Sequence, residues 1–212
     1  STTEQTLKRD FPGVRGRLVD LCTPTQRKFN VAVTTAAGRY MDAIVVDTKA
    51  ECLDCLSYMQ HNKVGRAQFI PLDSIKVKPI DESLRSLGPR HRLCADIMQG
   101  GDEGVRRAIL FAVGNTIVSD TLDDARTLCH GPGSENKKAS EGRREGGGER
   151  GRHRGEIKAV TLNGFLISKS GNMTGGTTNR DLDRAGQWDE KQFSDLKQRR
   201  QELESERDTL SR

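Results

Sequence analysis

Residues 32–48, AVTTAAGRYMDAIVVDT, and residues 108–121, AILFAVGNTIVSDT, decide the fold. Each stretch has small apolar residues at helical spacing, then a glycine, then an apolar run that ends near Asp-Thr. The glycine is a natural helix stop, and a continuous apolar run is typical of a buried strand. We therefore expect one helix–strand–helix unit to occur twice. The alternative is coincidence between two ordinary α/β segments.

A second helix is predicted to follow each strand. Thr48 and Glu51 form a T-x-x-E capping box, and Thr121 with Asp124 caps the corresponding helix of the second unit. On these two helices the apolar residues expected to face inward are Cys52, Leu53, Leu56 and Met59, and Leu122, Ala125, Leu128 and Cys129. The two units would then be similar α/β subdomains.

Short strands are predicted around the two units. One covers residues 16–22, followed by Thr23-Pro24 as the N-cap and first residue of a helix; another covers residues 93–97. Residues 69–70 and 75–77 each precede a proline. Because proline cannot donate to a central ladder, both segments are predicted to be edge strands.

Glycines mark the end of the second unit. Asn163-Gly164 between two short apolar runs predicts a β-hairpin. From there the glycines follow the spacing G-x6-G-x3-G-G, at Gly164, Gly171, Gly175 and Gly176, with Met173 between them. Glycine weakens a strand unless another backbone approaches closely. One interpretation is a sheet edge kept bare for a partner's strand; the other is a flexible loop.

Composition bounds the class of protein. The 212 residues carry 35 Lys and Arg against 30 Asp and Glu, a formal charge of +5. Polar residues concentrate in a glycine- and arginine-rich insert at 131–155 and in a charged tail at 186–212. No apolar run is long enough to cross a bilayer, and five cysteines, mostly among apolar neighbours, suit a reducing compartment. We expect a soluble, intracellular chain.

No pattern of catalytic, metal-binding or cofactor-binding residues stands out. Cys52-x-x-Cys55 has ligand spacing, but no second pair accompanies it, and a structural zinc site needs four ligands; buried helix cysteines are the simpler interpretation. Residues 164–170 resemble a P-loop without its second glycine, which the phosphate contact requires. We therefore expect no metal, no cofactor and no enzyme site.

Basic residues raise a possible contact with nucleic acid. The candidates are Arg90, Arg92, Arg106 and Arg107, with Lys137 and Lys138 in the insert. Clustered cations support weak, salt-dependent binding to phosphates, but no aromatic platform for base stacking is visible. The alternative for the insert is simple disorder.

The C-terminal tail has a heptad pattern. Leu196, Leu203 and Leu210 recur every seven residues, and three positions before them stand Phe193, Arg200 and Arg207. A solvated surface helix is one interpretation of this pattern, but the heptad spacing favours the root of a coiled coil. Such a helix needs a partner, which the residues before Phe11 could supply.

The sequence resembles the hinge domain of structural maintenance of chromosomes (SMC) proteins, most of all the hinges of the first SMC subunits of cohesin. The resemblance covers roughly residues 11–200 without the insert, and no function is transferred to the insert. The motifs that carry it are GVRGRLVDLC at 13–22, MDAIVVDT at 41–48, FIPLD at 69–73, VKP at 77–79, GNTIV at 114–118 with Asp120, the glycine series and WDEK at 188–191.

The resemblance implies a mixed α/β fold with two pseudo-symmetric subdomains and the roots of an antiparallel coiled coil at both termini. It places the N-terminal arm at 1–10, subdomain I at 11–80, a linker at 81–92, subdomain II at 93–185 and the returning arm at 186–212. It also implies pairing with the hinge of the third cohesin SMC subunit, with a weak homodimer in isolation.

The function implied is to close a ring around DNA for sister-chromatid cohesion, on chromosomes in the nucleus. The glycine segment would lie at one interface with the partner hinge, and the ATPase heads would lie elsewhere in the full-length protein. The alternatives are a basic nucleic-acid-binding module and the hinge of a different SMC complex.

Overall fold

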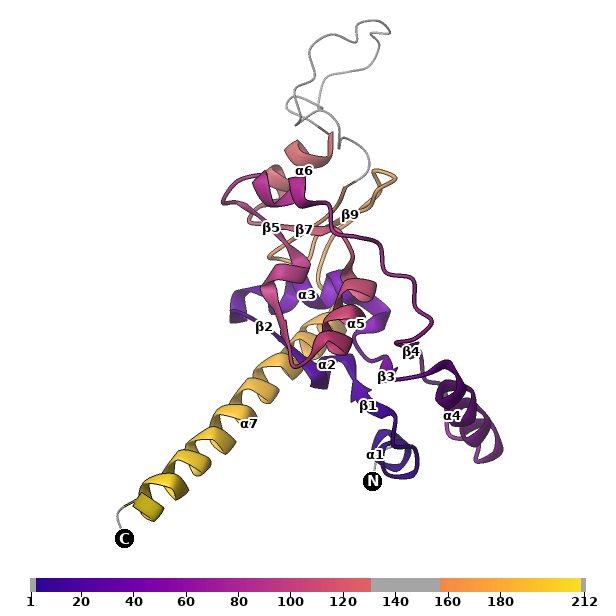
Figure 1. Cartoon of the computed structure of the whole chain (residues 1–212). Helices are drawn as coiled ribbons and strands as arrows, with labels where there is room; N and C mark the ends of the chain where they lie inside the picture. The colour runs from indigo at the N-terminus through magenta and orange to yellow at the C-terminus, as the bar shows by residue number, and fades with distance from the viewer. Residues whose placement is uncertain (1–2, 131–156, 211–212) are drawn as a thin grey trace, which may run out of the picture.

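The computed structural model describes residues 3–130 and 157–210 (Figure 1). Its α-helices are α1 Thr3–Asp10, α2 Leu18–Leu21, α3 Asn30–Ala37, α4 Lys49–His61, α5 Glu103–Val113, α6 Leu122–His130 and α7 Asn179–Leu210. Its strands are β1 Val14–Arg17, β2 Cys22–Pro24, β3 Ile44–Val46, β4 Phe69–Pro71, β5 His91–Leu93, β6 Met98–Gly100, β7 Thr116–Ser119, β8 Lys158–Thr161, β9 Leu166–Ile167 and β10 Met173–Thr174. The predicted mixture of helices and sheets is confirmed.

Two small sheets repeat the same arrangement of strands. In the first, β3 pairs antiparallel with β1 and parallel with β4; in the second, β7 pairs antiparallel with β5 and parallel with β8. The helix α4 connects β3 to β4, and α6 follows β7 in the corresponding place. The second sheet is larger because β9 and β10 continue it beyond β8, in the order β10-β9-β8-β7-β5.

The two repeats share a core. Strand β2 of the first pairs antiparallel with β6 of the second, with Thr23 opposite Gln99. One cluster of buried side chains continues from Leu18 and Val45 in the first repeat to Ile109 and Val118 in the second. The core therefore crosses from one repeat to the other. The linker role of residues 81–92 stays a prediction.

Local features of the repeat also match. Helices α3 and α5 end at Gly38 and Gly114, with φ and ψ of 54° and −124° in the first and 53° and −142° in the second. The Oγ1 of Thr48 accepts a hydrogen bond from the Glu51 N–H at 3.2 Å, and that of Thr121 accepts one from the Asp124 N–H at 3.1 Å. Both predicted N-caps are confirmed.

Several predicted strands were wrong in extent. Strand β1 ends at Arg17, and the next residues form α2, whose helical turn buries the neighbours Leu18 and Val19 together; a strand would point them to opposite faces. Strand β5 likewise ends at Leu93 before a 3-10 turn. Thr23-Pro24 lies in β2, so α3 begins only at Asn30. Residues 75–77 form no strand, whereas 69–70 do, in β4.

The inward face of α4 was also predicted incorrectly. The buried residues of the helix are Cys52, Cys55 and Met59, at the i, i+3, i+7 spacing of one narrow stripe. Leu53 and Leu56 directly follow Cys52 and Cys55, so each lies about 100° further around the helix than the buried cysteine before it, and their exposed fractions are 54% and 42%. Two leucines expected in the core therefore face solvent.

The C-terminal helix α7 begins at Asn179, earlier than the predicted arm at 186, and extends away from the body (Figure 1). Its first turns pack on α3: Trp188 is buried, and its Nε1–H donates to Thr34 Oγ1 at 3.0 Å. Beyond this contact the heptad side chains Phe193, Leu196 and Leu203 are exposed. This geometry is consistent with α7 being the root of an arm. The pairing of α7 in a coiled coil stays a prediction.

Candidate partner-binding edges

Two consecutive hairpins of the same kind form the edge of the second sheet. In the β8–β9 hairpin, Thr161 N–H donates to Phe165 O and Gly164 N–H donates to Thr161 O. In the β9–β10 hairpin, Ser168 N–H donates to Asn172 O and Gly171 N–H donates to Ser168 O. Both are three-residue loops, which need a left-handed residue at the third position.

This explains half of the glycine series. Gly164 and Gly171 occupy the left-handed positions, with φ of 81° and 83°, so the G-x6-G spacing is that of two successive hairpin turns. Gly164 is buried, and a Cβ there would lie 2.8 Å from Thr177 Cγ2 and 3.1 Å from Val31 Cγ1. The residues that pack closely against Gly164 therefore belong to its own chain.

The remaining glycines lie beside the exposed edge. Gly175 and Gly176 follow β10, and the chain from Asn172 to Arg180 is exposed. A Cβ on Gly175 would lie 2.9 Å from the Phe165 ring, whereas one on Gly176, at φ of 92°, would meet nothing within 4 Å. Gly175 thus makes room for a neighbouring ring, and Gly176 serves the backbone turn.

Strand β10 is an open edge. Ser168 N–H donates to Asn172 O at 2.8 Å, and bonded and non-bonded pairs alternate along an antiparallel ladder. The next pair, Ile167 with Met173, is therefore non-bonded, and the N–H and C=O of Met173 point away from β9. The Met173 side chain is 50% exposed. Among the described residues no strand pairs with this side of β10.

Strand β4 is the second open edge. Ile44 N–H donates to Gln68 O at 2.8 Å, and Leu72 N–H donates to Val46 O at 2.9 Å. The alternation of backbone groups then turns the N–H and C=O of the intervening Phe69 outward, together with the C=O of Pro71. The predicted edge strand at 69–70 is confirmed, since β4 is one of the two outer strands of its sheet within the described part of the chain. Phe69 is half-buried.

The candidate DNA-binding arginines each have a partner within the chain. Arg92 Nη1 lies 2.6 Å from Asp120 Oδ1, which is the counterpart of the 2.6 Å pair between Arg15 and Asp47 in the first repeat. The others are Arg90 with Asp124, Arg106 with Asp96, and Arg107 with the carbonyl of Ile75. Lys137 and Lys138 lie outside the described residues. DNA contact stays a prediction.

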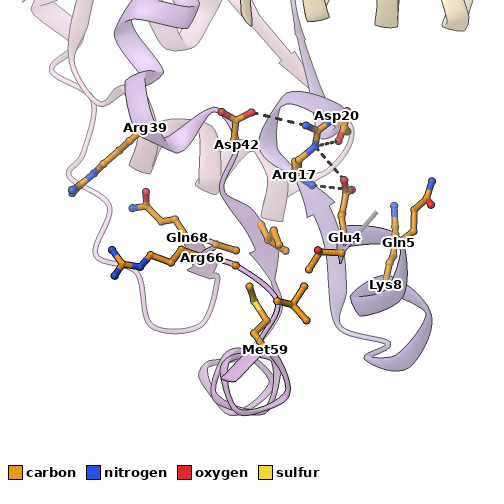
Figure 2. Close-up of a pocket in the computed structure, with 15 residues that line it drawn as sticks. Glu4, Gln5, Lys8, Arg17, Asp20, Arg39, Asp42, Met59, Arg66 and Gln68 are labelled. Atoms are coloured by element: carbon orange, nitrogen blue, oxygen red, sulfur yellow. Dashed lines mark hydrogen bonds and ion pairs between the residues drawn. The ribbon is translucent and has the colours of Figure 1, made fainter. Parts of the chain in front are cut away.

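A surface pocket of about 880 Å³ lies between α1 and the segment that leads into β4. Figure 2 shows Glu4, Gln5 and Lys8 on one side and Arg66 and Gln68 on the other. Its acidic residues surround one cation: Arg17 Nε lies 3.1 Å from Glu4 Oε2 and 2.8 Å from Asp20 Oδ2. This charge arrangement fastens α1 to β1 and offers no pair of facing carboxylates for acid–base chemistry.

Among the described residues, the cysteines and histidines are not grouped into a metal centre. All five cysteines are buried thiols, and within the residues that the structure describes no three metal-binding side chains converge. Burial raises the pKa of the Cys55 thiol to about 11, so this thiol stays protonated at neutral pH. In the same described part of the chain, no helix is both long and apolar enough to span a membrane.

The repeated α/β units, the glycine-bearing hairpins and the projecting α7 define a class of protein. Residues 11–129 match the family model for the flexible hinge domain of SMC proteins. The chain belongs to this family. It is a dimerisation module of SMC proteins and not their ATPase head.

Within that family, two of the similar curated relatives carry the same name. The chain is 37% identical over 206 residues to structural maintenance of chromosomes protein 1 from Arabidopsis thaliana, and 36% identical over 197 residues to the protein of that name from Schizosaccharomyces pombe. These matches cover 97% and 93% of the chain, but the chain spans only 15% and 14% of those relatives.

A solved hinge shares the fold. The crystal structure of an asymmetric dimer of the Geobacillus stearothermophilus SMC hinge domain has a TM-score of 0.65 and 27% sequence identity to the chain. The match covers 99% of this chain and 81% of that one. That SMC hinge, which shares the fold of this chain, was therefore solved as a dimer.

Proposed function

We propose that the chain is the hinge of a cohesin SMC subunit and pairs with the hinge of the third cohesin SMC subunit. This pairing would join two SMC arms and close a ring that entraps DNA on chromosomes in the nucleus. The observation that carries the proposal is the open β10 edge, with the outward backbone groups and exposed side chain of Met173. The similarity to the Arabidopsis and fission yeast proteins supports the choice of subunit.

Strand addition is the mechanism that this edge favours. A partner strand would hydrogen-bond to Met173, and main-chain bonds of this kind supply affinity while side-chain contacts supply specificity. The turn glycines keep the hairpin short, and Gly175 lets Phe165 pack beneath it. A second contact from the first repeat would close the ring.

The test is light scattering after size exclusion, on this chain alone and mixed with a purified hinge of the third cohesin SMC subunit. A one-to-one heterodimer that replaces any self-associated species supports the proposal. A stable homodimer without that heterodimer keeps the hinge assignment and overturns the cohesin pairing. A monomer in both samples overturns the pairing as well, and leaves DNA binding as the next function to test.

The role of the β10 edge is tested with Met173→Glu, measured by calorimetry against the same partner. A charge placed in a desolvated contact should weaken binding by tenfold or more. Asn163→Glu places the same charge at the exposed tip of the neighbouring β8–β9 hairpin and should bind as the wild type does. Equal affinities for the two variants would remove β10 from the interface.

A further inference from the structure

The pocket beside α1, here called the α1 pocket, has an apolar floor. The apolar residues that line it are Ile44 of β3, Met59 of α4, and Val64 and Ala67 of the segment that leads into β4. The end of α4 shapes this floor: Lys63 takes a left-handed φ of 53°, and the Val64 N–H donates to the Met59 carbonyl at 3.0 Å. This is the closure of a Schellman motif, and it turns the chain so that both ends of the closure line the pocket.

The carboxylates of the α1 pocket are already paired within the chain. Arg17 Nε lies 3.1 Å from Glu4 Oε2 and 2.8 Å from Asp20 Oδ2, and Arg17 Nη1 lies 4.0 Å from Asp42 Oδ1. The other oxygen of Asp42 lies 3.0 Å from Arg184 Nη2. The acidic side of the pocket is therefore balanced by cations of the protein itself.

Three further cations of the α1 pocket have no such balance. Figure 2 shows Lys8 on the α1 side and Arg39 and Arg66 on the opposite side, and no carboxylate drawn there pairs with any of the three. All three side chains are exposed. Arg39 contacts only its neighbour Tyr40, by a hydrogen bond to the hydroxyl at 3.0 Å and by lying over the ring at 5.0 Å; these contacts leave its charge uncompensated.

The layout of these groups decides which kind of ligand is complementary. An extended peptide can place an apolar side chain on the floor and carboxylates toward the cations on both sides, so that apolar burial and opposite charge act together. A nucleic acid backbone offers no apolar group for the floor, and its phosphates would face the carboxylates of Glu4 and Asp20. The volume of about 880 Å³ accommodates a few side chains, in the range of ligand pockets.

We propose that the α1 pocket binds an acidic peptide segment of a further protein, with one apolar residue on the floor and flanking Asp or Glu side chains paired with Lys8, Arg39 and Arg66. All residues that line the pocket come from α1 and the first repeat, whereas the β10 edge belongs to the second sheet. The inference therefore adds a separate docking site to the proposed pairing function and does not depend on that pairing.

The test is selection of peptides from a random phage-displayed library on the isolated chain. The enriched peptides should carry Asp or Glu on both sides of a shared apolar residue. The most enriched peptide, made synthetically, is then measured by calorimetry on the wild type and on the double variant Lys8→Glu, Arg66→Glu. Reversal of two exposed charges that face the peptide should weaken binding by about tenfold or more.

A matched control makes the same change of charge outside the pocket. Lys76 and Lys78 are exposed and do not line the pocket, so Lys76→Glu with Lys78→Glu should leave the affinity within about twofold of wild type, as expected for charges outside a contact. Because all four lysine and arginine positions are exposed, thermal unfolding should show both double variants folded.

The apolar floor is tested by Val64→Thr. This substitution keeps the shape of the half-buried side chain and adds a hydroxyl, whose burial under the apolar anchor costs free energy. The peptide should bind about threefold more weakly or worse, by the same principle. Unchanged binding would mean that no apolar residue sits on the floor.

The remaining outcomes decide the identity of the ligand. A selection without acidic enrichment, or enriched peptides that bind the Lys8→Glu, Arg66→Glu variant as tightly as the wild type, would overturn the proposal. Duplex DNA, titrated at physiological salt, is the competing ligand: binding that is lost in the same variant, with no acidic peptide enriched, would assign these cations to nucleic acid instead. Each measurement uses the chain alone, so none of these results depends on whether the two hinges pair.

Discussion

At the scale of single residues, the clearest mark of the internal repeat is a pair of glycines. Gly38 and Gly114 end equivalent helices with φ of 54° and 53°, and their strongly negative ψ lies outside the region open to L residues with side chains. Open space surrounds both positions: Gly38 has no heavy atom within 4 Å of a Cβ, and Gly114 meets one only at 3.9 Å. Their requirement for glycine is therefore one of backbone conformation and not of room.

Gly38→Ala and Gly114→Ala should each lower the free energy of unfolding by on the order of 1–3 kcal/mol, and by similar amounts because the two conformations match. Gly101→Ala is the control, since that glycine is exposed, has open space and no positive φ; it should change stability by less than about 0.5 kcal/mol. Denaturant titration measures all three. A neutral effect at Gly114 beside a large one at Gly38 would contradict the equivalence of the two helix ends.

At the scale of elements, the attachment of α7 to α3 decides how the arm leaves the hinge. Trp188 fills a buried site, Asp189 accepts hydrogen bonds from Asn30 at 2.8 Å and from Arg27 at 3.0 Å, and Arg184 donates to the Gly38 carbonyl at 2.7 Å. These contacts fix the first turns of α7, while the rest of the helix projects from the body (Figure 1).

Trp188→Ala should cost about 3–5 kcal/mol of stability through the cavity it leaves. Trp188→Phe should cost about 1–2 kcal/mol, since it keeps most of the packing but leaves Thr34 Oγ1 without its donor. Phe193→Ala, at a position 72% exposed on the same helix, is the control and should stay within about 0.5 kcal/mol of wild type. Equal costs at Trp188 and Phe193, measured by denaturant unfolding, would mean that α7 is not docked.

At the scale of the whole molecule, two small sheets share one core, and among the described residues β4 and β10 are outer strands of these sheets. The described elements on either side of the insert are already packed: α6 buries Ala125 and Cys129, and β8 pairs with both β7 and β9. Apart from Pro132, the residues of 131–155 include a single apolar side chain, Ala139. The stability of the body therefore should not depend on them.

Replacing 131–155 with a short glycine–serine linker should leave the melting temperature within a few degrees of wild type, because apolar burial supplies most of the folding free energy and this segment contributes almost none of it. The linker must still let α6 and β8 keep their positions. Differential scanning calorimetry makes the comparison, and a drop of more than about 10 °C would show that the insert is structural.

The local chemistry of the chain was largely readable from its residues. The capping boxes at Thr48 and Thr121, the glycine stops and the hairpin at Gly164 follow from preferences of short segments, and the structure confirms them. Buried strands at β3 and β7 follow from continuous apolar runs. Pro71 correctly indicated an edge strand, since its missing N–H faces outward.

Long-range packing explains what short segments could not predict. Leu18 and Val19 have the composition of a strand but form a helical turn, because only that turn directs both into the shared core. Leu53 and Leu56 are of the residue type found in cores but are exposed, because α4 turns Cys52, Cys55 and Met59 toward the first sheet instead. The order in which the strands pair is likewise not visible in the sequence, since strand order is a property of the folded sheet.

The sequence by itself determined the repeat, its caps and turns, and the family, because these depend on residues close together along the chain or on their order. The tertiary structure alone decided in which order the strands pair, which leucines stay uncovered and which arginines are already paired. Those features arise from contacts between residues distant in the sequence, and their energies depend on which groups folding removes from water.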